Sequence, residues 1–256
     1  MKFYRLTTPW RDLNIFETYP GVSGKAYRGI PKANGDTVTN GKELMRLIGT
    51  PDFDTSNLPV FDYFHLETSD RDKKLWEWCL NDVHQIQGLY SPRSMSMYIS
   101  PKVKDVFTRY IVAQPSGYVL SKLKYQRDYL DYYIFYCTPF CTFNDVIYNK
   151  TSFQIFTDSS KKVLMGNYEG KVENFNEFEA AKAQSRQKYD GLLDYKSVYL
   201  KKYYDFFMLY GDPAFYVSER LKNALEENGV TGIEFEKETD IEFHFLETPP
   251  PICNSL

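Results

Sequence analysis

Residues 215–238 constrain the fold of this chain most, because strand, helix and strand patterns follow one another within this short segment. The composition of residues 215–217 is typical of a strand, and Ser218 is a residue type that commonly caps helix N-termini. Apolar residues then recur at the spacing of one helical face: Leu221, Ala224 and Leu225. The first half of the segment therefore predicts a short strand followed directly by a capped, half-buried helix.

The second half of the segment changes to strand periodicity. Gly229, after Asn228, is expected to end the helix, because glycine readily adopts the left-handed conformation found at many helix ends. After Gly232 the period becomes two, with Ile233 and Phe235 alternating with glutamates, which predicts a strand with one buried face. We expect a cap, two turn glycines and core positions to carry this structure: Ser218, Leu221, Leu225, Gly229, Gly232, Ile233 and Phe235.

Strand and helix patterns also alternate through the rest of the chain. Aromatic and branched residues predict strands at residues 129–140 and at Ser152–Thr157, and residues 198–209 return to β composition. Helical spacing predicts helices at residues 41–48 and 174–189. Together these elements predict an α+β fold of mixed sheets with a few packed amphipathic helices.

Two regions are expected along the chain. Residues 1–92 are rich in turn signals and β composition, whereas residues 93–256 carry the clearer α+β pattern. A length of 256 residues fits either two regions or one continuous globular unit. Both arrangements stay open at the level of sequence.

An internal similarity supports the strand-cap-helix interpretation. Residues 97–107 align without gaps to residues 215–225, and the tyrosine, the serine and the second lysine are identical. Pro101, directly after Ser100, suits the first turn of a helix that follows a cap. This imperfect repeat has only two copies, so a duplication and the shared preferences of such units both account for it.

The same C-terminal residues resemble a known family. Residues 215–222 (Phe-Tyr-Val-Ser-Glu-Arg-Leu-Lys) and 229–235 (Gly-Val-Thr-Gly-Ile-Glu-Phe) are similar to the C-terminal signature of a group of bacterial immunity proteins. Genes of that group tend to lie beside polymorphic toxins, including contact-dependent and type VI secretion effectors. Looser similarity extends upstream through residues 204–207, 130–133 and 99–104 and the neighbourhood of Asp82.

The resemblance implies a binding protein rather than an enzyme. A member of this family binds a cognate toxin domain stoichiometrically and blocks it, without chemistry of its own. The matching motifs consist of a cap, turn glycines and core hydrophobic residues, so they carry no catalytic residue over to this chain. The expected partner is therefore a toxin or effector domain.

An acidic run near the C-terminus suggests where such a partner binds. From Glu226 to the end of the chain, eight acidic residues stand against a single lysine, Lys237. A negative surface of this kind speeds association with a basic surface, such as the groove of a nuclease. The candidate toxin-binding residues are Glu234, Glu236, Glu238, Asp240 and Glu242. The alternative is a solvated face or a charged edge strand that prevents aggregation.

Asp82 and His84 are the strongest catalytic candidates. In a strand, two residues that are two apart face the same side and could share a proton-transfer task. Asp82 is also a residue type common in turns and caps, so a structural role competes with the catalytic one. A small-substrate enzyme with a pocket around these residues is one alternative function, and an adaptor or structural module of a secretion system is another.

Bulk properties exclude several classes of protein. No segment approaches the roughly 20 apolar residues that span a bilayer, and the N-terminus lacks the apolar run of a signal peptide. The four cysteines and three histidines do not follow zinc-site spacing. We therefore expect a cytoplasmic protein that binds neither membrane nor nucleic acid and uses no cofactor or metal. The oligomeric state stays open.

Overall fold

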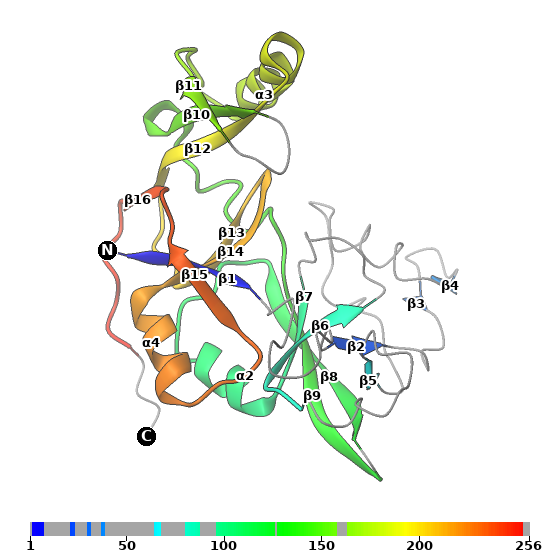
Figure 1. Cartoon of the computed structure of the whole chain (residues 1–256). Helices are drawn as coiled ribbons and strands as arrows, with labels where there is room; N and C mark the ends of the chain where they lie inside the picture. Colours follow the sequence, from blue (N-terminus) through cyan, green and yellow to red (C-terminus); the bar gives the residue numbers. More distant parts are fainter. Residues whose placement is uncertain are drawn as a thin grey trace.

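The α+β class predicted from the sequence is confirmed by a computed structural model of the chain (Figure 1). The structure describes residues 2–7, 21–23, 30–31, 37–38, 64–67, 80–87, 96–125, 127–157 and 163–252. The helix predicted at residues 41–48 lies outside these ranges. The described strands form two four-stranded sheets, a closed barrel and a short two-stranded pair.

The first sheet combines the N-terminal strand with C-terminal strands. Its order is β13 (Phe206–Leu209), β14 (Asp212–Ser218), β1 (Phe3–Thr7) and β15 (Glu234–Glu238). β1 is antiparallel to both of its neighbours, and Tyr4 lies opposite Val217 on one side and Glu238 on the other. The helix α4 (Glu219–Glu227) follows β14 directly. The first residues of the chain thus complete a sheet that otherwise comes from the last 51 residues of it, 206–256.

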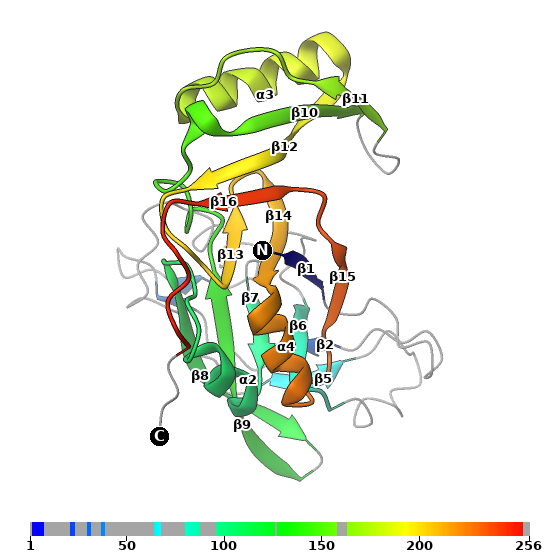
Figure 2. The same cartoon turned by 90° about the vertical axis from the view of Figure 1, so that its left-hand side faces the viewer.

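The second sheet is covered on one side by a helix. Its order is β11 (Leu164–Asn167), β10 (Ser152–Thr157), β12 (Gly191–Leu200) and β16 (Glu242–Phe245), and β16 is parallel to β12. Figure 2 shows α3 (Phe175–Tyr189) lying along this sheet. The side chain of Asn174 caps α3, and Asp190 ends it with a positive φ of 47°. The strand predicted at Ser152–Thr157 and the helix predicted at 174–189 are confirmed.

The barrel contains the longest hairpin among the residues that the structure describes. Its strands follow the order β2 (Gly21–Ser23), β5 (Phe64–Glu67), β8 (Ser116–Tyr125), β9 (Asp128–Cys137), β7 (Ser96–Ile99) and β6 (Val83–Gln87). The helix α2 (Pro101–Phe107) follows β7, and β3 (Ile30–Pro31) pairs separately with β4 (Thr37–Val38). β9 confirms most of the strand predicted at residues 129–140.

An aromatic core connects the three assemblies. Phe243 of β16 contacts Phe3 of β1 and Phe207 of β13, with ring centroids 5.0 Å and 5.2 Å apart. Phe206 of β13 contacts Phe135 of β9 at 5.2 Å, which joins the first sheet to the barrel. Rings at such distances add specific edge-to-face contacts to their burial. One hydrophobic core therefore passes through both sheets and the barrel.

The β-rich run at residues 198–209 serves two sheets rather than one. Its first residues end β12 in the second sheet, and its last four form β13 in the first sheet. Residues 201–205 connect the two and leave the β conformation. Composition predicted the strands correctly but does not show where a chain passes from one sheet to another.

The three α-helices of the described residues are 7, 15 and 9 residues long. Within this part of the chain, none is both long and apolar enough to cross a membrane.

Candidate functional site

The acidic run lies along edge strands of both four-stranded sheets. β15 ends the first sheet and β16 ends the second, and residues 239–241 connect them. Four of the five candidate side chains are exposed: Glu234, Glu236, Asp240 and Glu242. Glu238 belongs to β15, but its side chain lies outside the described part of the structure. The tertiary structure therefore places these carboxylates along two edge strands and the short connection between them. We call residues 234–242 the acidic margin.

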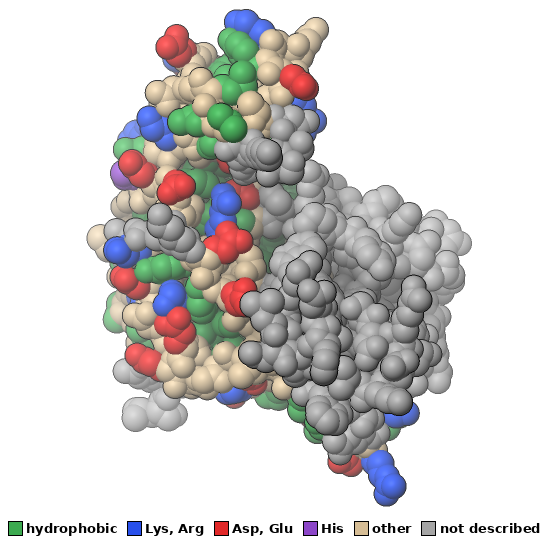
Figure 3. Space-filling view, in the orientation of Figure 1, with side chains coloured by type: hydrophobic (Ala, Val, Ile, Leu, Met, Phe, Trp, Pro, Cys, Tyr) green, Lys and Arg blue, Asp and Glu red, His purple; other side chains and the backbone are tan. Residues whose placement is uncertain are grey.

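Other charges interrupt this acidic margin. Figure 3 shows acidic and basic side chains interspersed on the described part of the face that it draws. Lys222 of α4, for example, has its ammonium group 5.4 Å from the ring centroid of Phe235 and 2.7 Å from the Glu226 carboxylate. The field along β15 is thus weaker than the sequence count indicates, since a neighbouring cation screens part of it.

The signature residues face the interior or shape turns. Ser218 accepts a hydrogen bond from the N–H of Leu221 at 3.3 Å, and Leu221 and Leu225 are buried. Gly229 and Gly232 have φ values of 59° and 81°, which glycine adopts most easily. A side chain at Gly232 would also collide with a carbonyl, because its Cβ would lie 2.1 Å from the Val83 oxygen. Half-buried Ile233 and Phe235 pack against the core.

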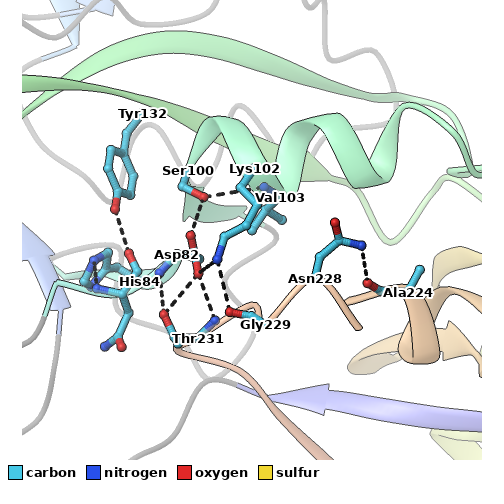
Figure 4. Close-up of polar contacts among 11 residues, drawn as sticks. Asp82, His84, Ser100, Lys102, Val103, Tyr132, Ala224, Asn228, Gly229 and Thr231 are labelled. Atoms are coloured by element: carbon cyan, nitrogen blue, oxygen red, sulfur yellow. Dashed lines mark hydrogen bonds and ion pairs between the residues drawn. The ribbon is translucent and has the colours of Figure 1, made fainter. Parts of the chain in front are cut away.

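Asp82 is the centre of a polar cluster between the barrel and α4 (Figure 4). Its Oδ1 accepts a hydrogen bond from the Ser100 hydroxyl at 2.8 Å. Its Oδ2 accepts from the Lys102 ammonium at 2.7 Å and from the N–H of Thr231 at 3.0 Å. The Lys102 ammonium also donates to the Gly229 carbonyl at 3.0 Å. We call Asp82, Ser100, Lys102 and Thr231 the Asp82 clasp.

The contacts of the Asp82 clasp stabilise the ionised carboxylate. Burial alone raises the pKa of Asp82, but the hydrogen bonds from Lys102, Thr231 and Ser100 outweigh burial, so the pKa is lowered. A carboxylate held in this way is a poor proton acceptor at neutral pH, because its acceptor positions are already occupied.

His84 points away from this carboxylate and into the interior. Its Nε2 accepts a hydrogen bond from the N–H of Asn81 at 3.2 Å, and its ring lies 6.1 Å from the Tyr132 ring. Burial lowers the pKa of His84 to about 4, so the imidazole is neutral at pH 7. Among its hydrogen bonds in the described chain, none joins it to Asp82. The two catalytic candidates are close in sequence, but their side chains hydrogen-bond to different residues.

A second cluster repeats the first at the other strand-cap-helix unit. Asp205 accepts hydrogen bonds from the Ser218 hydroxyl at 2.6 Å and from the N–H of Ile111 at 3.1 Å. Arg220 donates to both oxygens of the same carboxylate, from Nε at 2.6 Å and from Nη2 at 2.7 Å. The Tyr203 hydroxyl also donates to this carboxylate, at 2.9 Å. We call Asp205, Ser218, Arg220 and Ile111 the Asp205 clasp.

The two clasps are reciprocal. Each aspartate precedes a strand, β6 or β13, that is antiparallel to the strand leading to the capping serine. That second strand is β7, which ends directly before Ser100, or β14, which ends at Ser218. Asp82 then binds the segment after α4, at Thr231, whereas Asp205 binds the segment after α2, at Ile111. Each unit therefore holds the chain that leaves the helix of the other unit, in the manner of an internal two-fold arrangement.

Sequence reasoning found the serines of this repeat and singled out Asp82, but it did not predict that Asp82 and Asp205 bind those serines. The alignment of residues 97–107 with 215–225 matches the caps, and a basic residue follows each cap by two positions. The aspartates lie 18 residues before Ser100 and 13 residues before Ser218, so no gapless alignment includes both. An aspartate directly before an apolar strand was the only available signal.

No family model and no curated protein matches this chain.

Cys137 and Cys141, the closest pair of cysteines in the sequence, are both buried with sulfurs 3.6 Å apart. No group of three or more potential metal ligands occurs among residues that the structure describes.

Proposed function

We propose that this chain is an immunity protein that binds a cognate bacterial toxin domain and blocks it by direct stoichiometric occlusion. The resemblance of residues 215–222 and 229–235 to the signature of immunity proteins suggests the class. The observation that carries the proposal is the exposure of Glu234, Glu236, Asp240 and Glu242 along two neighbouring edge strands. The signature residues nearby are buried in the core or shape turns, which leaves the exposed carboxylates as the residues that contact a partner.

Electrostatics gives the margin a function beyond solubility. Carboxylates at an exposed edge attract a basic surface over about 10 Å at 0.1 M salt and raise the association rate. A toxin that acts on nucleic acid needs such a basic surface, and an acidic margin competes for it. The immunity protein then excludes the substrate by occupying its binding surface, and no catalytic group is required.

The alternative enzyme has weaker support. A pocket around Asp82 and His84 needs a free acid or base, yet the carboxylate is held by three donors and the imidazole is buried. An adaptor or structural module of a secretion system is the third candidate, and no described contact favours it. A toxin-domain gene directly beside this one favours immunity, whereas turnover of a small substrate favours the enzyme.

Co-expression with the toxin domain encoded by a neighbouring gene tests the proposal. We expect the chain to restore growth and to co-purify with the toxin in a fixed ratio. Failure of both growth rescue and co-purification would reject the immunity function.

A charge reversal tests the proposed surface. The triple variant Glu234→Lys, Glu236→Lys and Asp240→Lys should slow association about tenfold or more, and the rate should no longer fall as the salt concentration rises. The matched control changes the same net charge at exposed positions on other elements: Asp105→Lys, Asp128→Lys and Glu169→Lys. Equal rates for the triple variant and the unmodified protein, or an equal loss in the control, would remove the acidic margin from the proposal.

A further inference from the structure

Two buried cysteines lie in contact with each other where the barrel meets the first sheet. Cys137 and Cys141 are 0% and 4% exposed, and their sulfurs are 3.6 Å apart. Neither residue belongs to the Asp82 clasp, to the Asp205 clasp or to the acidic margin. A free cysteine packs like a small hydrophobic residue, and its reactivity usually decides what else it does. The surroundings of the two sulfurs therefore determine what the pair can do.

The backbone between the two cysteines forms a turn that holds the sulfurs together. Cys137 is the last residue of β9, and the N–H of Cys141 donates to the Thr138 carbonyl at 3.0 Å. The N–H of Thr138 donates to the Pro115 carbonyl at 3.4 Å, which fixes the start of the turn. A disulfide bond is about 2.05 Å long, so the sulfurs have about 1.5 Å to close. Modest rotation of the two side chains covers this distance.

The two sulfurs have different surroundings. The Cys141 sulfur accepts a hydrogen bond from the N–H of Met208 in β13 at 3.4 Å, and such a donor stabilises a thiolate. Burial, and then the neighbouring Cys141 sulfur, raise the pKa of the Cys137 thiol, so Cys137 stays protonated. Cys141 is therefore the cysteine that reacts first, and Cys137 is the thiol held beside it.

We propose that Cys137 and Cys141 are an oxidisable dithiol, which hydrogen peroxide converts to a disulfide inside the folded protein. The Cys141 thiolate attacks one peroxide oxygen and the O–O bond breaks, which gives a sulfenic acid and, with the thiol proton, one water. The Cys137 sulfur then attacks the Cys141 sulfur, and the S–O bond breaks to release the second water. One peroxide thus takes two electrons from two thiols. A molecule little larger than water suits a site that is nearly closed to solvent.

The site suits the oxidised form as well as the reduced one. A disulfide is uncharged, so the burial that disfavours a thiolate does not disfavour it. The Thr142 hydroxyl donates to the Met208 carbonyl at 2.7 Å, so the turn is already joined to β13. A disulfide would fasten this turn to the end of β9 in the barrel. Oxidation should therefore stabilise the junction between the barrel and the first sheet, whether or not the chain binds a toxin.

A single tryptic peptide reports on the site in the unmodified full-length protein. Residues 128–150 follow Arg127, end at Lys150 and contain both cysteines of the pair. They contain no methionine, which peroxide would also oxidise. After hydrogen peroxide treatment of the native protein, we expect this peptide to weigh two hydrogen atoms less and to resist alkylation. Dithiothreitol should restore both thiols.

Two matched serine variants test the order of the reaction. Cys137→Ser keeps the reactive sulfur and removes its partner, so peroxide should leave a sulfenic acid at Cys141 that dimedone traps. Cys141→Ser keeps only the protonated, fully buried thiol, which should be oxidised at least about tenfold more slowly. Equal rates in the two variants would contradict the assigned order.

The melting temperature tests whether the native structure accommodates the disulfide. We expect oxidation to raise the melting temperature of the unmodified protein by about 5 °C, because the closed loop is short. The proposal is overturned if the peptide stays reduced in the native protein, or if it is oxidised only in urea that unfolds the chain. A disulfide that lowers the melting temperature would overturn it as well.

Discussion

The Asp82 clasp and the Asp205 clasp share an aspartate, a capping serine and a basic residue but differ in burial. Asp205 has an exposed fraction of 0%, and Arg220 binds its carboxylate with two nitrogens. The Asp82 side chain is 14% exposed, and Lys102 offers it a single ammonium group and is itself 42% exposed. Charges close to water are screened, whereas a buried carboxylate depends entirely on its protein partners. The same local motif should therefore contribute unequally to stability.

The two clasps also join different parts of the molecule. The aspartate of the Asp205 clasp lies in residues 201–205, where the chain passes from the second sheet to the first, and it binds the segment after α2. The Asp82 clasp ties the barrel, through β6, to the segment after α4. If burial decides their strength, the contact with the barrel is the weaker of the two.

Removing the buried carboxylate should have the largest effect. Asp205→Ala leaves Arg220 without its partner and removes the acceptor of the Ser218 hydroxyl, and we expect it to cost about 3 to 5 kcal/mol of unfolding free energy. Urea denaturation followed by circular dichroism measures this loss. The double variant Asp205→Ala and Arg220→Met serves as the control, because it removes the uncompensated charge and should recover part of the stability.

Lowering the pH should have the second-largest effect on the unfolding free energy, through His84 of the barrel. Burial lowers the pKa of His84 from 6.5 to about 4, so the unfolded chain binds a proton at a higher pH than the folded chain does. Stability therefore falls as the pH drops from about 6.5 to about 4, by about 3 kcal/mol in total. Unfolding free energies measured at several pH values test this, with His84→Gln as the variant that should flatten the profile. A profile that keeps its slope in His84→Gln contradicts the assignment.

Removing the charge of the partly exposed aspartate should cost less. Asp82→Asn keeps an acceptor for Ser100 and loses the ion pair with Lys102, and we expect a loss of about 1 kcal/mol. The lowered pKa of Asp82 means that this contribution is complete above the unfolded pKa and is lost as pH falls through the folded pKa. Parallel urea titrations of Asp82→Asn and Asp205→Asn decide the comparison. Equal losses would show that burial does not separate the clasps.

Exchanging the two cations should have the smallest effects. Arg220→Lys replaces a two-nitrogen contact with a single one and should cost about 1 kcal/mol, whereas Lys102→Arg keeps its charge at a more exposed site and should change stability by less than about 0.5 kcal/mol. Thermal unfolding of both variants under identical conditions provides the measurement. A larger loss in Lys102→Arg than in Arg220→Lys would reverse the proposed order.

The sequence by itself determined the local elements of this protein. Ser218, Leu221 and Gly229 predicted where α4 begins, which face it buries and where it ends, and the structure has each of these features. Asn174 predicted the start of α3 in the same way. Such signals are readable because caps and helical faces depend on residues three or four positions apart.

The tertiary structure alone decided which elements meet. β1 lies between β14 and β15, more than 200 residues away in the chain, and the run at residues 198–209 divides between two sheets. Strand pairing of this kind depends on long-range packing, for which a single sequence carries no local pattern. The candidate site follows the same rule: composition identified the acidic run, but only the fold placed it on two adjacent sheet edges and gave Asp82 and Asp205 their partners.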